Sequence, residues 1–159
     1  NTEEALRQLA TIYIQKGNVK MALECYDRIL QLDALAADIY FRKAHLLLKQ
    51  DEIAEALRNY RKAVSLSPAN TQYSIKLAQI YSSRGANSHA VEILSDLLRF
   101  APSCSKAWAE QARMYESLGE YENASYSWRK VLEINKKNPI AIQALLRLSS
   151  DSFKTNRSN

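Results

Sequence analysis

The residue types that most often perform catalysis are few in this chain of 159 residues. His45 and His89 are the only histidines, and Cys25 and Cys104 are the only cysteines. The sequence contains no glycine-rich phosphate loop, no HExxH motif and no CxxC pair. Because nucleophilic catalysis needs a base held against the nucleophile, these isolated side chains predict no catalytic residue, no metal ligand and no cofactor site.

Charge and hydropathy argue against nucleic-acid binding and against membrane insertion. The net charge is +5, from 22 Lys and Arg against 17 Asp and Glu, but the basic residues form no run. A surface of mixed charge is therefore favoured over a nucleic-acid-binding surface. No apolar stretch approaches the roughly 20 residues that span a bilayer, so no direct membrane insertion is expected.

The elements that must position these side chains repeat with a period of 34 residues. Gly17, Gly85 and Gly119 follow this period, with Asp51 in the corresponding place of the second repeat. A fixed period of this size indicates a stack of similar units that bury their apolar faces against their neighbours. Small residues also keep the period in two series: Ala10, Ala44, Ala78 and Ala112, and Ala22, Ala56, Ala90 and Ala124.

Apolar residues spaced three and four apart predict two amphipathic helices in each repeat. Asn70 and Ser103 are expected to cap the helices that follow them. Asn138, as the cap before Pro139 at the first helical position, predicts a ninth helix that covers the last repeat, and residues 152–159 are expected to be a disordered tail. The eight paired helices are predicted over residues 2–15, 18–31, 36–49, 52–65, 70–83, 86–99, 104–117 and 120–134.

The fourth repeat carries the most complete motif and resembles the tetratricopeptide repeat. The resemblance implies an all-α, right-handed α-solenoid of antiparallel helix pairs. It implies a single domain over residues 1–151, with repeats at 3–36, 37–70, 71–104 and 105–138 and a capping helix at 139–150. The residues that carry the motif in the fourth repeat are Trp108, Gln111, Ala112, Tyr115, Gly119, Tyr121, Ala124, Trp128, Val131 and Leu132.

The repeat motif also sorts the aromatic side chains. Tyr73 and Tyr126 fall outside the motif and are expected to be exposed, while Lys43 and Gln111 replace residues that are usually apolar and are expected to loosen their repeats. The aromatic residues expected to fill the core are Tyr13, Tyr26, Tyr40, Tyr60, Tyr81, Tyr115, Tyr121 and Trp128.

Proteins of this family hold peptides on the concave face formed by the first helix of each repeat. The corresponding positions here hold five bases and three acids. The carboxylate clamp of the co-chaperone subfamily would need two Asn residues that are absent at these positions, whichever way the clamp is aligned. A solvated charged surface is the alternative interpretation of this face. The predicted groove residues are Arg7, Thr11, Arg42, His45, Lys76, Gln79, Lys106 and Arg113.

Together these features predict a non-enzymatic adaptor or scaffold that binds a protein or peptide, with an acidic partner favoured by the five bases. The alternative is a structural subunit of a larger assembly that uses its convex face or its ends, and self-association remains open. Cys25 and Cys104 are separated by more than two repeats, so no disulfide is expected between them. The predicted location is therefore the reducing cytoplasm.

Overall fold

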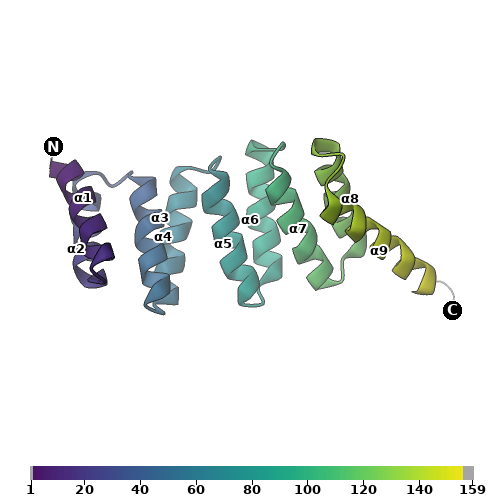
Figure 1. Cartoon of the computed structure of the whole chain (residues 1–159), viewed down its shortest axis with the longest axis horizontal. Helices are drawn as coiled ribbons and strands as arrows, with labels where there is room; N and C mark the ends of the chain where they lie inside the picture. The colour runs from purple at the N-terminus through teal and green to yellow at the C-terminus, as the bar shows by residue number, and fades with distance from the viewer. Residues whose placement is uncertain (1, 156–159) are drawn as a thin grey trace. The chain divides into compact units, whose positions relative to one another are not determined.

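The computed structural model describes the backbone of residues 2–155 and the side chains of residues 2–150, and it contains nine helices and no strand over the described range (Figure 1). The predicted all-α fold of paired helices is confirmed, and each of the eight paired helices begins and ends within one residue of its predicted bounds. The helices are α1 (Thr2–Gln15), α2 (Val19–Leu32), α3 (Ala37–Lys49), α4 (Ile53–Leu66), α5 (Thr71–Ser83), α6 (Asn87–Phe100), α7 (Ser105–Leu118), α8 (Tyr121–Ile134) and α9 (Pro139–Thr155).

The chain forms two compact units, Asn1–Ser67 with α1 to α4 and Pro68–Asn159 with α5 to α9. In unit 1, α1 packs on α2, α2 on α3, and α3 on α4. In unit 2 each helix packs on the next, and the first helices α5 and α7 also touch. The single domain predicted from the sequence, and the hand of its superhelix, remain predictions.

The turns between paired helices have the geometry that their residues favour. The three glycines of the turns have φ between 72° and 78°, and Asp51 takes φ 62° in the same place. This left-handed conformation carries little steric cost for glycine and is tolerated by Asp. A first helix can therefore reverse into its second helix within a few residues.

Two of the three predicted caps are confirmed. The Asn70 side chain accepts hydrogen bonds from the backbone of Gln72 and Tyr73, and that of Asn138 accepts one from Ala141 at 3.0 Å. The prediction for Ser103 is wrong, because the cap position of α7 is Cys104, with no side-chain hydrogen bond.

The last helix is longer than predicted. It continues through Thr155, so residues 152–155, assigned to a disordered tail from the sequence, are helical. The rest of that predicted tail, residues 156–159, lies outside the described residues. Polar composition alone did not reveal that the helix runs on past Ser150.

The packing core follows the alanine series but not every aromatic prediction. All eight alanines of the two series are 0% exposed, which allows the paired helices to approach closely. Tyr26, Tyr60 and Trp128 are buried as predicted. Tyr121, also expected in the core, is 59% exposed, whereas Tyr73, expected at the surface, is 8% exposed. Tyr73 lies on α5, which also buries the two residues that follow it.

The two polar replacements in the motif are held by partners rather than left loose. The Gln111 side chain donates to Ser95 Oγ at 2.8 Å and accepts from Ser127 Oγ at 3.1 Å, which links α7 to both α6 and α8. In unit 1 the Lys43 ammonium donates to Asp27 at 2.5 Å, linking α3 to α2. Since buried polar groups are costly only when unpaired, neither replacement opens its repeat.

The Gln111 network predicts that replacing its two serines lowers stability when Gln111 is present and raises it when Gln111 is replaced by leucine. In the wild type, Ser95→Ala with Ser127→Ala leaves the buried Gln111 amide without partners, and we expect a loss of about 1–3 kcal/mol in unfolding free energy. In the Gln111→Leu background the same two changes remove the Ser127 hydroxyl, which is 0% exposed and has lost its acceptor, and should raise stability. Urea unfolding of the four proteins checks this, and equal signs in both backgrounds would contradict the network.

Candidate functional site

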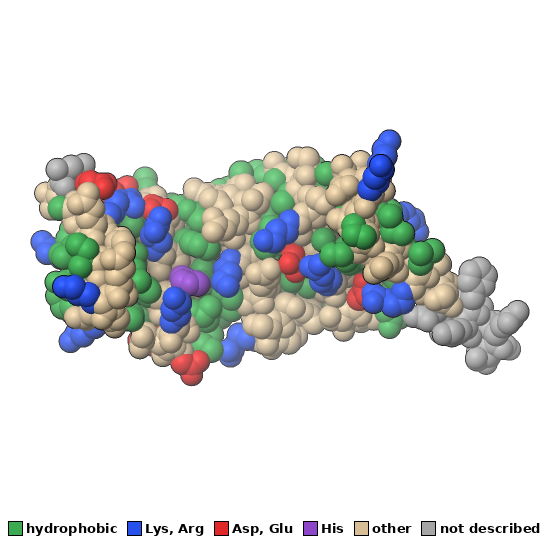
Figure 2. All heavy atoms as spheres, viewed as in Figure 1, with side chains coloured by type: hydrophobic (Ala, Val, Ile, Leu, Met, Phe, Trp, Pro, Cys, Tyr) green, Lys and Arg blue, Asp and Glu red, His purple; other side chains and the backbone are tan. Residues whose placement is uncertain are grey.

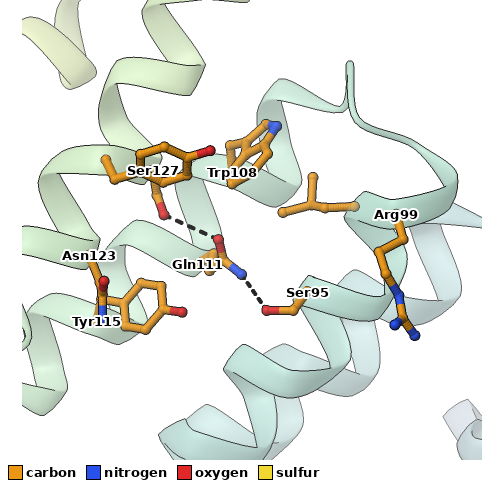
Figure 3. A pocket seen from close by; sticks show the side chains of 9 residues that line it. Ser95, Arg99, Trp108, Gln111, Tyr115, Asn123 and Ser127 are labelled. Carbon is orange, nitrogen blue, oxygen red and sulfur yellow. Dashed lines mark hydrogen bonds between the residues drawn. The ribbon is translucent and has the colours of Figure 1, made fainter.

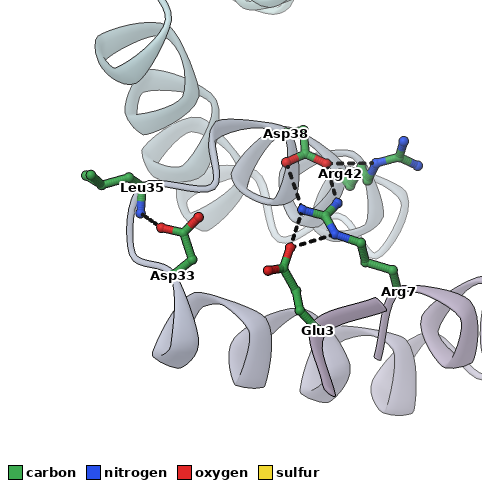
Figure 4. A network of polar contacts seen from close by, with 6 residues as sticks. All are labelled: Glu3, Arg7, Asp33, Leu35, Asp38 and Arg42. Carbon is green, nitrogen blue, oxygen red and sulfur yellow. Dashed lines mark hydrogen bonds and ion pairs between the residues drawn. The ribbon is translucent and has the colours of Figure 1, made fainter. Parts of the chain in front are cut away.

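In unit 1, Arg7 fixes the first helices α1 and α3 to each other (Figure 4). Its guanidinium donates two hydrogen bonds to the Asp38 carboxylate, at 2.6 and 3.3 Å, and one to Glu3 at 2.9 Å. The hydrogen bond to Asp38 raises the pKa of Arg7 above its ordinary value. Burial alone would raise the pKa of Asp38, but its hydrogen bond and charge interactions with Arg7 and Arg42 bring it below its ordinary value. Arg7, predicted as a groove residue, is thus committed to an internal ion pair.

The other three predicted residues of unit 1 differ in accessibility. The Thr11 hydroxyl donates to the backbone carbonyl of Arg7 at 3.0 Å. Arg42 has a side chain that is 61% exposed, with its guanidinium 3.7 Å from the Asp38 carboxylate and a hydrogen bond to Tyr26. His45 is exposed, with its Nδ1 3.5 Å from the hydroxyl of Tyr60, whose pKa burial raises to about 12. Arg42 is therefore the accessible cation of this unit's first-helix face.

In unit 2 the first helices α5 and α7 form a face on which two cations lack ion pairs. Gln79 donates to the Glu110 carboxylate at 2.9 Å, and Arg113 approaches the same carboxylate at 3.4 Å. Glu110 is thereby neutralised within the face. Lys76 and Lys106 form no ion pair with any residue that the structure describes. Figure 2 shows basic side chains with few acidic ones among them over this part of the molecule.

A pocket of about 520 Å³ continues this face between α7 and α9. Trp128 donates its indole N–H to Glu116 at 2.6 Å, and Glu116 also pairs with Arg147. The Arg113 guanidinium lies 5.8 Å from the centre of the Trp128 ring, within cation–π range. The pocket is lined by Arg113, Glu116, Trp128, Ile140, Gln143, Ala144 and Arg147.

Arg147 is a functional candidate that the sequence prediction missed. It stands one 34-residue period after Arg113, so the signal was present in the sequence. It was overlooked because the ninth helix was interpreted only as a cap. In the structure α9 takes the place of a further first helix and brings a fourth cation to the face of unit 2.

The links between first helices share one sequence spacing. Arg7 with Asp38, Gln79 with Glu110, and Glu116 with Arg147 are each separated by 31 residues. A residue on one first helix thus contacts the residue 31 positions later on the next first helix. This is three residues, about one helical turn, less than the 34-residue period. The repeat that sets the fold also sets which side chains can pair along this face.

Over the described residues no helix is both long and apolar enough to cross a bilayer. The described residues also contain no group of three or more His, Cys, Asp or Glu side chains arranged to hold a metal ion. The arrangement on the first helices is one of charged and amide groups on an open surface, which can form hydrogen bonds and ion pairs with a partner.

Comparison with family models gives matches under one description. Models described as tetratricopeptide repeat match residues 7–71, 47–114 and 105–138. Human protein O-mannosyl-transferase TMTC1 is 26% identical over 141 residues, which cover 89% of this chain but 16% of that protein. In eight curated relatives, the stretch that matches this chain covers between 7% and 22% of the relative's length.

Solved structures show the same fold. A tetratricopeptide repeat protein from Parabacteroides merdae superposes with a TM-score of 0.81 at 21% identity, over 98% of this chain and 63% of that one. The first such domain of Spaghetti (RPAP3), solved with the HSP90 peptide SRMEEVD, superposes with a TM-score of 0.64 at 23% identity, over 75% and 94%.

Proposed function

Because this chain belongs to the tetratricopeptide repeat family, we propose that it is a non-enzymatic protein-interaction module that binds an acidic extended segment on the first-helix face of unit 2. The observation that carries the proposal is the pair of uncompensated cations, Lys76 and Lys106, on two touching helices. Charged donors on an open face suit partner carboxylates through charge-assisted hydrogen bonds. The relative solved with an HSP90 peptide supports peptide binding by this fold.

Further side chains extend the proposed binding surface. Arg113 and Arg147 lie along the pocket between α7 and α9, where each is held by a glutamate that leaves part of its guanidinium open. The Arg113 side chain is 49% exposed and that of Arg147 is 58% exposed. A segment running from α5 to α9 would meet a cation from each first helix of the unit.

The mannosyl-transferase activity in the name of the human relative is not assigned to this chain. The matched region covers 16% of that protein, and the residues described here offer no catalytic cluster. The predicted cytoplasmic location and self-association likewise remain predictions.

Charge reversal at the two lysines tests the proposed site. A capped peptide of alternating Ser and Glu, about ten residues long, is titrated into the protein by calorimetry, beside the same peptide with Gln for Glu. We expect Lys76→Glu with Lys106→Glu to weaken the acidic peptide at least tenfold, since each charged hydrogen bond is worth about 1.5–3 kcal/mol. Added salt should weaken it further.

The matched control moves the same charge elsewhere on unit 2. Arg129→Glu with Lys137→Glu changes two exposed residues that lie outside α5, α7 and α9 and should leave the affinity within about twofold. Circular dichroism verifies that both proteins stay folded. Equal weakening by both double variants, or equal binding of the Gln peptide, would reject the site and favour the alternative of a structural subunit.

A further inference from the structure

A second pocket, of about 370 Å³, lies in unit 2 between the second helices α6 and α8, with α7 as its floor (Figure 3). Gln111 lies at the centre of this pocket between Ser95 and Ser127, to which it is hydrogen-bonded. This second pocket shares no lining residue with the pocket between α7 and α9. The equivalent residue of the third repeat is Leu77, which is 2% exposed. The polar floor therefore distinguishes the fourth repeat from the third.

Two aromatic rings form a notch on this pocket. Trp108 and Tyr126 meet edge to face, with ring centres 6.0 Å apart and planes at 75°. The Trp108 indole N–H donates to the Pro102 carbonyl at 2.8 Å, which fixes the ring. Tyr126 is 53% exposed, and the Lys130 ammonium lies 5.6 Å from the centre of its ring. The Trp108 ring is thus held in place before any ligand arrives, with the Tyr126 ring at 75° to it.

The polar groups of the pocket are neutral or internally paired, and they include several donors. None of the nine lining residues is a carboxylate. Arg99, the only charged one, already pairs with Asp96 at 2.8 Å and keeps further N–H groups. Asn123 donates one amide hydrogen to Glu120, which leaves its second hydrogen for a ligand. The rim therefore suits a neutral ligand that is rich in acceptors.

We propose that this pocket binds a proline-rich segment in the polyproline II conformation. Such a segment has no internal hydrogen bonds, and its prolines present carbonyl acceptors without N–H donors. It therefore needs ring faces for its pyrrolidines and donors for its carbonyls. The Trp108–Tyr126 notch supplies the faces, and Asn123 and Arg99 supply the donors. This site is separate from the first-helix face and does not depend on the function proposed for it.

The test is a titration of the full chain with a polyproline peptide of about ten residues, followed by calorimetry and by tryptophan fluorescence. Trp108 lines the pocket while Trp128 is 2% exposed, so the spectral change should come from Trp108. We expect Tyr126→Ala to weaken binding at least tenfold, because it removes one wall of the notch, and Tyr126→Phe to retain it.

Tyr121→Ala is the matched control, since Tyr121 is 59% exposed on the same helix and does not line the pocket. It should bind polyproline like the wild type, as should the Lys76→Glu and Lys106→Glu double variant. Absence of polyproline binding, equal loss in the two alanine variants, or tighter binding of the Ser and Glu peptide in a Tyr126-dependent way would each overturn the proposal.

Discussion

Replacing Trp128 by alanine is expected to lower the free energy of unfolding by about 3–5 kcal/mol, the range for large aromatic side chains lost from a core. Trp128 is 2% exposed and packs in one cluster with Ala112, Ala124 and Val131. Its removal leaves a cavity between α7, α8 and α9. It also takes the indole donor away from Glu116, which then faces Arg147 alone.

Denaturant unfolding followed by circular dichroism measures this effect. Tyr121→Ala serves as the control on the same helix and should change stability by less than about 0.5 kcal/mol, as exposed replacements usually do. Trp128→Phe should fall between the two, because it keeps a ring but loses the N–H. If the alanine variants at 121 and 128 are equally stable, the assignment of Trp128 to the core is wrong.

Replacing Leu148 by alanine is expected to cost about 2–3 kcal/mol, because this side chain anchors α9 to the rest of unit 2. Leu148 is 8% exposed and belongs to the same cluster as Trp128, with Ala141 and Ala144. Loss of the anchor should release α9 and uncover the Trp128 side. Hydrogen exchange should then show weaker protection in α9 and α8 than in α5.

The chain offers a matched leucine for comparison. Leu146 lies two residues away on α9 and is 66% exposed, so Leu146→Ala should leave stability and exchange close to wild type. The two variants remove the same atoms and differ only in burial. Equal effects from both would show that α9 does not dock through the face described.

The period of the sequence was sufficient to predict the helices but not every side chain on them. Small residues that keep the 34-residue period, such as Ala22 and Ala90, mark close helix contacts, so the pairing of the helices follows from their spacing. An aromatic residue is less specific, because a position that is buried inside a stack can be open where a helix begins. Tyr121, the first residue of α8, is 59% exposed although its position fits the motif.

The candidate site was predictable only in part, because a charged side chain on the correct face can be paired with another residue of the same protein. The spacing placed Arg7 and Lys76 on first helices alike, yet Arg7 is bound to Asp38 while Lys76 has no ion-pair partner among the described residues. Whether such a cation is paired or free of an ion pair depends on the residue 31 positions away. That relation is visible only once the structure shows how neighbouring first helices are offset. The pocket above Gln111 was hidden for a similar reason, since the residues that line it come from three helices.

The hydrogen bonds of Gln111 also restrict how such a chain can be rearranged. Repeat proteins are often regarded as interchangeable modules, but Ser95 of the third repeat is paired by a residue of the fourth. Copying the third repeat into the fourth position would present a leucine, Leu77 in the original, to that serine hydroxyl. The buried polar contacts between repeats therefore favour one order of the repeats. Exchanging repeats would lower stability even if every helix formed.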